Sequence, residues 1–191
     1  MNLLPYDGTV FYFQKIFCQI DSEKIFETLL NSIDWKNDEA FIYGKHIITK
    51  RKVAWYGDEN YEYKYSKTSK FALPWTSDLI EIKNIVEKCT NNSYNSCLLN
   101  LYHTGDEGMT WHSDDEETMK KNGSIASVSF GALRKFSFKR KQSKEVLSLE
   151  LETGSILEMK DNTQTHWLHA LPKTKKVLMP RINLTFRSFT V

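Results

Sequence analysis

The sequence has little of what marks a secreted or membrane-spanning protein. Its 191 residues hold three cysteines, Cys18, Cys89 and Cys97, with no CxxC pair among them. So few cysteines, in an odd number, are typical of a reducing compartment and speak against a disulfide framework. No stretch of about 18 apolar residues occurs, and the first residues lack the basic and apolar regions of a signal peptide. We therefore expect an intracellular protein, in the cytoplasm or nucleus, that does not span a membrane.

A large excess of charge of one sign is also missing. The formal net charge is +2 and the sequence pI is about 8.3, too mild to indicate a nucleic-acid partner by itself. There is no internal repeat, no low-complexity tract and no linker rich in Pro, Gly and Ser. With 40% hydrophobic residues, the chain can bury one substantial core, so a single domain is expected.

Two amphipathic helices are predicted in the first half of the chain. The segment 21–35 opens with the capping residues Asp21 and Ser22, and the segment 74–92 offers Ser77 or Asp78 as a cap and ends at two asparagines. Their apolar residues recur at the spacing of one helical face, which is most simply explained by contact with the core. These residues are Ile25, Phe26, Leu29, Leu30 and Ile33 in the first helix and Leu79, Ile82, Val86 and Cys89 in the second.

Short strands are predicted from residue 97 onward, where the apolar period changes from helical to alternating. The segments are 97–102, 125–131, 135–140, 146–152, 155–159 and 181–189, separated by turn residues. The sequence "ETGS" at 152–155 has the composition of a hairpin turn. We therefore predict an α+β fold in which helices flank a double-stranded β-helix, a jelly roll whose two sheets form a cup.

A candidate metal site lies in "TWHSDDEE", residues 110–117. On an extended strand, residues i and i+2 point the same way, so His112 and Asp114 can offer a nitrogen and an oxygen to one metal ion. Further along, "THWLHALP" contains His166 and His169, either of which can supply a third ligand from a facing strand. Two histidines and one carboxylate are used by non-haem Fe(II) enzymes, and also by zinc hydrolases.

The last predicted strand, "RINLTFR" at 181–187, favours the iron alternative. One face carries Arg181, Asn183, Thr185 and Arg187, and the other carries only apolar residues. The two arginines are about 20 Å apart at roughly 3.3 Å per residue, too far to hold one carboxylate together. A small dicarboxylic acid, bound at one end by a guanidinium and reaching the metal with the other, fits this face. 2-Oxoglutarate is such an acid.

Together these motifs resemble those of the AlkB family of Fe(II)/2-oxoglutarate-dependent nucleic-acid demethylases, most of all the branch of the eukaryotic DNA-repair AlkB homologues. The resemblance runs from residue 41 to the C-terminus and is carried by "LLNLY", "WHSDDE", "SIASVSFGALRKFSF", "THWLHALP" and "PRINLTFR". It implies that the iron ligands are His112, Asp114 and His169, rather than His166. It also implies 2-oxoglutarate contacts from Asn100, Tyr102, Arg181, Asn183 and Arg187.

The reaction that the resemblance implies is oxidative demethylation of N1-methyladenine and N3-methylcytosine in DNA or RNA. It would use Fe(II), O2 and 2-oxoglutarate and release formaldehyde, succinate and CO2. Residues 1–95 would hold the N-terminal helices and a substrate-binding, nucleotide-recognition lid, and residues 96–191 the catalytic jelly roll. Together they would form a single domain, which we expect to act as a monomer.

The substrate contacts are also implied by the resemblance. A methylated base would be flipped out of its stack, with Tyr63 and Tyr65 resembling the lining of the base pocket. Ile42 or Tyr43 resembles the tip of a hairpin that inserts into a duplex. Asp115 resembles a catalytic-site aspartate that pairs with an arginine, here Arg51, and that approaches the cationic base.

Three basic runs, at 49–52, 134–144 and 172–177, are expected to contact phosphates. Two other functions stay open. The first is a 2-oxoglutarate-dependent hydroxylase of a protein or a small molecule, which the aromatic hairpin and the basic runs disfavour. The second is an inactive nucleic-acid-binding relative, which the complete metal triad and the arginine pair disfavour.

Overall fold

The computed structural model describes residues 1–42, 45–65, 68–116 and 118–190, and of residues 40–42, 45, 63–65 and 68–70 the backbone alone. The helices in these residues are α1 (Gln19–Ser32), α2 (Ser77–Thr90) and α3 (Thr163–His166). The strands are β1 (Thr9–Phe13), β2 (Lys36–Ile42), β3 (Lys45–Gly57), β4 (Glu62–Tyr65), β5 (Thr68–Phe71), β6 (Leu73–Pro74), β7 (Ser96–Tyr102), β8 (Met109–His112), β9 (Ile125–Gly131), β10 (Arg134–Arg140), β11 (Val146–Leu151), β12 (Ser155–Lys160), β13 (Trp167–Leu171) and β14 (Arg181–Arg187). No helix in the described part of the chain is long and apolar enough to cross a membrane.

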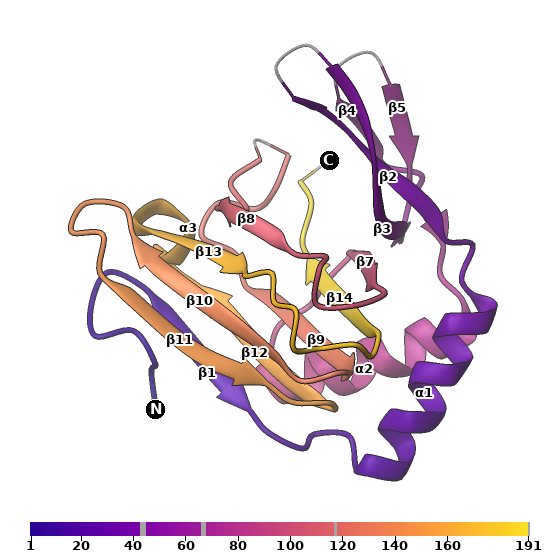
Figure 1. Cartoon of the computed structure of the whole chain (residues 1–191), viewed down its shortest axis with the longest axis horizontal. Helices are drawn as coiled ribbons and strands as arrows, with labels where there is room; N and C mark the ends of the chain where they lie inside the picture. Colours follow the sequence, from indigo (N-terminus) through magenta and orange to yellow (C-terminus); the bar gives the residue numbers. More distant parts are fainter. Residues whose placement is uncertain (43–44, 66–67, 117, 191) are drawn as a thin grey trace.

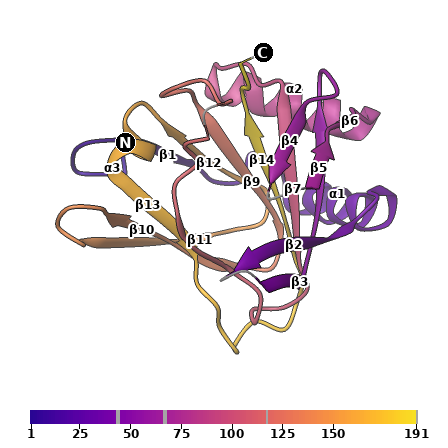
Figure 2. The same ribbon diagram turned by 90° about the horizontal axis from the view of Figure 1, so that it is seen from above.

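Two sheets face each other, and helices cover the outer face of the larger one (Figures 1 and 2). The larger sheet has eight strands in the order β1-β12-β9-β14-β7-β3-β2, with β6 beside β3, and the smaller has four in the order β11-β10-β13-β8. A separate pair, β4 and β5, stands with β2 and β3 above the cup (Figure 1). The predicted α+β jelly roll is confirmed.

Two apolar cores lie on the two sides of the large sheet. One joins α1 and α2 to this sheet, and it includes Ile182, Leu184 and Phe186 of β14 at 0% exposure. Full burial of such a side chain contributes roughly 1.5–3 kcal/mol. The other core lies between the two sheets and includes Phe138 and Trp167. Strand β14 therefore turns its apolar face to the helices and its polar face into the cup, as its alternation predicts.

Both long helices start slightly before the predicted caps. The N-cap of α1 is Cys18, whose thiol accepts a hydrogen bond from the Asp21 backbone N–H, and Ser22 is buried one turn further on. A thiol is a weak acceptor, so the sequence offers no strong signal for this cap. The N-cap of α2 is Thr76, and its end at Asn91, in the left-handed conformation with φ 54°, is as predicted.

The prediction of a hairpin at 152–155 is wrong. Strand β11 pairs with β10, whereas β12 pairs with β9 and β1, so this turn crosses from the small sheet to the large one. Gly154 has φ +72°, and a Cβ there would lie 2.4 Å from the Phe17 carbonyl oxygen. A crossover turn needs the same left-handed residue as a hairpin, so composition alone does not separate the two.

Residues 1–95 contribute more strands than the sequence predicts. Strand β1 pairs with β12, and β3 pairs with β7, so both belong to the large sheet. We therefore propose that residues 1–95 and 96–191 form one domain, since a single sheet runs through both.

Candidate metal and 2-oxoglutarate site

Three side chains from two strands and one loop converge inside the cup. Strands β8 and β13 are antiparallel neighbours, and their register places His112 opposite His169, with ring centroids 4.2 Å apart. Asp114 follows β8, and its Oδ1 lies 3.6 Å from His112 Nε2 and 3.8 Å from His169 Nε2. One ligand atom from each residue lies within 4.8 Å of the others, which suits a single metal ion. His166 is not a member of this group.

The protonation of the triad suits a metal. His112 Nδ1 lies 2.8 Å from the Thr110 carbonyl oxygen, which can only accept, so Nδ1 donates this hydrogen bond. The other ring nitrogen, Nε2, faces the triad and is the one that can bind a metal. Burial lowers the pKa of His169 to about 4, so this imidazole is neutral at pH 7. Burial would raise the pKa of Asp114, but Arg187 and the two histidines outweigh it and lower the pKa. The result is a donor set of two imidazoles and one carboxylate.

Arg187 controls how Asp114 can bind. Its Nη2 lies 2.6 Å from Asp114 Oδ2, the oxygen that faces away from the histidine pair. Burial would lower the pKa of Arg187, but Asp114 and Glu116 raise it. The family resemblance implies that Arg187 contacts the organic acid. In the structure it holds one carboxylate oxygen of Asp114 and leaves the other free to bind a metal, while its contact with the acid stays a prediction.

A second group of predicted residues forms two cross-strand pairs between β14 and β7. The register places Arg181 opposite Tyr102 and Asn183 opposite Asn100. Asn183 donates to Ser127 Oγ at 2.8 Å and to the Val128 carbonyl at 3.0 Å. The Oδ1 of Asn100 is buried and has no hydrogen-bond partner in the described part of the chain.

Positive charge gathers at this second group, where Arg181 forms no ion pair with a carboxylate of the described residues. Arg181 is 2% exposed and donates to Ser129 Oγ at 2.8 Å, and its Nε has no partner among the described residues. Burial, together with the neighbouring guanidinium of Arg134, lowers the pKa of Arg181 to about 10. The Cζ atoms of Arg181, Arg134 and Arg51 lie 5.7, 5.9 and 6.0 Å from the Tyr102 ring centroid. A buried cation with an unfilled donor fits a carboxylate ligand.

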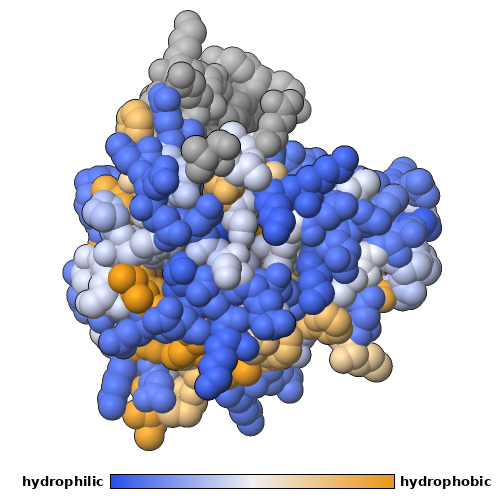
Figure 3. All heavy atoms as spheres, turned by 180° about the vertical axis from the view of Figure 1, so that it is seen from behind, coloured by the Kyte–Doolittle hydropathy of each residue, from blue (hydrophilic) through white to orange (hydrophobic). Residues whose placement is uncertain are grey.

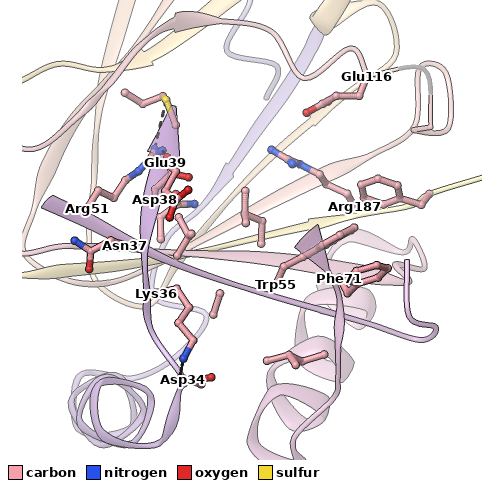
Figure 4. Close-up of a pocket in the computed structure, with 17 residues that line it drawn as sticks. Asp34, Lys36, Asn37, Asp38, Glu39, Arg51, Trp55, Phe71, Glu116 and Arg187 are labelled. Atoms are coloured by element: carbon pink, nitrogen blue, oxygen red, sulfur yellow. Dashed lines mark hydrogen bonds and ion pairs between the residues drawn. The ribbon is translucent and has the colours of Figure 1, made fainter. Parts of the chain in front are cut away.

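A cavity of about 520 Å³ adjoins both groups, and its wall includes Asn100 and Arg187. Figure 4 shows Arg187 and Glu116 reaching into it from one side, and Arg51 and Asp38 standing on the other. Glu116 Oε2 is buried with no hydrogen-bond partner among the described residues. Glu116 was not predicted to belong to the site, and the one signal for it in the sequence was its place directly after two aspartates.

The predicted pair of Arg51 with Asp115 is wrong. Arg51 forms an ion pair with Asp38 and donates to Met109 Sδ at 3.4 Å, while Asp115 is exposed and accepts from Ser113 Oγ at 3.1 Å. The reason is a shift in the β2–β3 register: residues 37 and 39 face 52 and 48, so residues 49–51 lie opposite Asp38 alone. Such a shift re-aims side chains, and nothing in the composition signals it.

Four residues predicted as substrate contacts are not placed. Tyr43 lies outside the described residues, as do the side chains of Tyr63, Tyr65 and Ile42. The strands that flank Tyr43 do pair, with Ile42 opposite Lys45. These contacts stay predictions.

Known proteins are similar to this chain over most of its length. The family whose model matches is the 2OG-Fe(II) oxygenase superfamily, over residues 9–187. DNA oxidative demethylase ALKBH2 of Bos taurus and that of Mus musculus are each 37% identical over 183 residues, covering 90% of this chain and 66% and 77% of those proteins. This chain therefore spans about two thirds of the Bos taurus protein.

The solved structure of OsALKBH1 has the same fold. It superposes with a TM-score of 0.64 at 15% identity, covering 94% of this chain and 97% of that one. Identity this low speaks for the fold alone. The superfamily match spans nearly the whole chain, and the Mus musculus relative shares more than a third of the aligned residues, so the chain belongs to the AlkB family of the 2OG-Fe(II) oxygenase superfamily.

Proposed function

We propose that this protein is an oxidative demethylase of N-alkylated bases in DNA or RNA, with Fe(II) and 2-oxoglutarate as cofactors. The observation that carries the proposal is the His112, Asp114 and His169 triad beside the buried guanidinium of Arg181. The cavity next to them is lined by Arg187, which holds Asp114, and by Asn100. The name of the relatives, DNA oxidative demethylase, supports the nucleic-acid substrate. We further propose that the protein acts as a monomer inside the cell, in the cytoplasm or nucleus.

The triad residues would hold Fe(II). His112 and His169 would supply imidazole nitrogens, and Asp114 would supply one oxygen because Arg187 holds the other. Two nitrogens and one oxygen on one side of the ion leave further coordination positions open. Bound Fe(II) and 2-oxoglutarate, with O2, supply the oxidising power that hydroxylates the N-methyl carbon.

Arg181 and the pair of Asn100 and Tyr102 would hold 2-oxoglutarate. Arg181 offers a charged donor to the distal carboxylate in a pocket that excludes water, where a charge-assisted hydrogen bond is strong. This anchoring would orient the acid toward the triad, whose Asp114 contacts Arg187 further along the same face of β14. The role of this part of the chain is binding and orientation.

The cavity would receive the flipped base. N1-methyladenine and N3-methylcytosine carry positive charge, and Glu116, Asp38 and Glu39 place carboxylates on the cavity wall. Opposite charge at short range favours the alkylated base over its neutral parent. The hydroxymethyl product on a ring nitrogen is a hemiaminal, which releases formaldehyde without help from the protein and restores the base.

Mass spectrometry of oligonucleotides tests the proposal. An oligonucleotide that bears N1-methyladenine or N3-methylcytosine should lose about 14 mass units, one CH2, only when protein, Fe(II), 2-oxoglutarate and O2 are all present. The His169→Ala variant should lose this activity, and the matched His166→Ala variant should keep it. Succinate formation without any change in nucleic-acid mass would instead identify a hydroxylase of another substrate. Oligonucleotide binding without 2-oxoglutarate turnover would identify an inactive relative.

A further inference from the structure

Trp111 is an exposed aromatic side chain directly beside the metal site. Strand β8 is the last strand in the order of the small sheet, so one of its edges is unpaired in the described structure. Residues 109 and 112 of β8 face 171 and 169 of β13, so β8 has one extra residue there. This is a β-bulge, a feature common at sheet edges and next to active sites, where it re-aims side chains.

The bulge has a direct consequence for Trp111. Met109 joins the core between the sheets, and His112 joins the triad, so both face into the cup. Thr110 and Trp111 together oppose Ala170 and face out, and the Trp111 side chain is 37% exposed. An indole of this size would normally lie in a core or an interface, because burying it is strongly favourable.

One lysine of β10 lies over this indole, and a second lysine, just after β10, lies beside the next residues of the chain. Lys139 Nζ lies 4.6 Å from the Trp111 ring centroid, and Lys139 forms no ion pair within the described residues. Lys141 Nζ lies 3.2 Å from Ser113 Oγ and 2.9 Å from the Gln164 carbonyl oxygen. A strip of positive charge therefore runs from Trp111 to the residue that separates His112 from Asp114. We call Trp111, Lys139 and Lys141 the Trp111 patch.

The back of the molecule offers control residues for this patch. Figure 3 shows that face largely covered by hydrophilic residues, with hydrophobic ones gathered toward its lower edge. Helix α2 lies on that side (Figure 2) and carries Ile80, at 44% exposure, and the exposed Lys88. These two residues match Trp111 and Lys139 in exposed apolar character and in charge, and they lie far from the metal site.

We infer that the Trp111 patch binds the nucleotide next to the target base in a single strand of DNA or RNA. The inference rests on the proposed function and names the form of its substrate. An aromatic ring on which a base stacks, beside cations that contact phosphates, is how single-stranded nucleic acid is bound without sequence preference. In a duplex the bases already stack on each other, so the ring finds a free base face only in an unpaired strand. The patch therefore favours single strands over duplexes.

The first test measures binding of the full chain to a short labelled oligonucleotide with one N1-methyladenine, by fluorescence anisotropy. Trp111→Ala should weaken single-strand binding by roughly 5- to 100-fold, the effect of losing one stacked base. It should leave binding of the matching duplex nearly unchanged. Trp111→Phe should retain most of the single-strand affinity, and Ile80→Ala should bind like the original protein.

The second test measures how much the charge of Lys139 contributes to binding. Lys139→Gln should reduce the slope of log affinity against log salt concentration by about 0.7 for a single strand, because one phosphate contact is lost. Lys88→Gln should leave the slope unchanged. Thermal unfolding of each variant checks that the fold is kept.

Several outcomes would overturn the inference. Trp111→Ala could bind the single strand like the original protein, or lose single-strand and duplex affinity equally, as a purely structural role would predict. Polyglutamate could compete as well as the oligonucleotide, which would assign the patch to an acidic protein. Demethylation by the original protein is measured separately. If the original protein demethylates and Trp111→Ala binds the single strand as well as it does, only this inference is wrong. If binding depends on Trp111 but no demethylation occurs, the proposed function is wrong.

Discussion

Replacing Arg187 by methionine should destabilise the metal-free protein strongly. The ion pair of Arg187 with Asp114 joins side chains that are 12% and 4% exposed, at 2.6 Å. Removing one partner of a buried pair costs about 3–5 kcal/mol, because the remaining charge stays buried without compensation. For a chain of this size, 1 kcal/mol corresponds to roughly 2–4 °C, so Tm should fall by about 6–20 °C.

A metal ion should offset part of this loss. In the Arg187→Met variant the positive ion takes over the neutralisation of Asp114, so the gap in Tm between variant and original protein should narrow. Differential scanning fluorimetry with and without Mn(II), in place of oxidation-sensitive Fe(II), measures both numbers. The same titration gives the metal affinity of each protein.

Arg181 provides the matched control for this prediction. At 2% exposure it is more deeply buried than Arg187, whose side chain is 12% exposed, but no carboxylate of the described residues forms an ion pair with it. Arg181→Met therefore removes a buried charge without leaving another one behind, and Tm should change little until 2-oxoglutarate is added. A metal-free Arg187→Met protein within about 2 °C of the original, or an equal loss in Arg181→Met, would refute the ion-pair reasoning.

Three further changes have expected outcomes. The pKa of His169 is about 4 in the fold against an ordinary 6.5, so between these pH values the unfolded chain binds more protons than the folded one. The free energy of unfolding of the metal-free protein should therefore fall by about 3 kcal/mol as the pH drops from about 6.5 to 4. In urea titrations, His169→Gln should flatten this part of the dependence of the unfolding free energy on pH. Gly131 has φ +87°, and a Cβ would lie 2.6 Å from the Pro180 carbonyl oxygen, so Gly131→Ala should lower the free energy of unfolding by about 1–3 kcal/mol in urea titrations, and an unchanged midpoint would contradict this. Glu116→Gln removes from the cavity wall a carboxylate that forms no ion pair within the described residues, so it should raise KM for a methylated oligonucleotide several-fold and leave KM for 2-oxoglutarate unchanged. Equal changes in both KM values would argue against base selection by charge.

The residues of β14 and β7 could be placed from the sequence because their register is unbroken. Seven consecutive pairs join the two strands, from Arg181 opposite Tyr102 to Arg187 opposite Ser96. Alternation therefore predicts correctly which side chains enter the cup and which enter the core. The convergence of His112, Asp114 and His169 follows from the same rule, helped by the resemblance, which selects His169 over His166.

Two residues were misplaced or missed in the reasoning from the sequence because they lie where the register of a strand pair shifts. Arg51 faces Asp38 across the irregular part of β2 and β3, and Trp111 lies in the bulge of β8. Neither segment contains a glycine or proline to signal the irregularity, so the alternation rule continues through it and assigns the wrong neighbour. Partners across a register shift depend on the position of the opposite strand, which local sequence does not encode.

Arg134 was missed for a different reason. It is 1% exposed, and its guanidinium donates to the carbonyl oxygens of Thr104, Glu107 and Pro172, at 3.3, 2.7 and 3.1 Å. In the sequence it opens the basic run 134–144, which composition assigns to solvent or phosphate. Burial in fact makes it part of the cationic pocket beside Arg181, and it also fixes the loop that leads into β8. The role of a basic residue in such a run can therefore be assigned only once its strand register is known. Side chains alternate along a strand, so the register decides whether the residue faces phosphate outside the cup or a carboxylate within it.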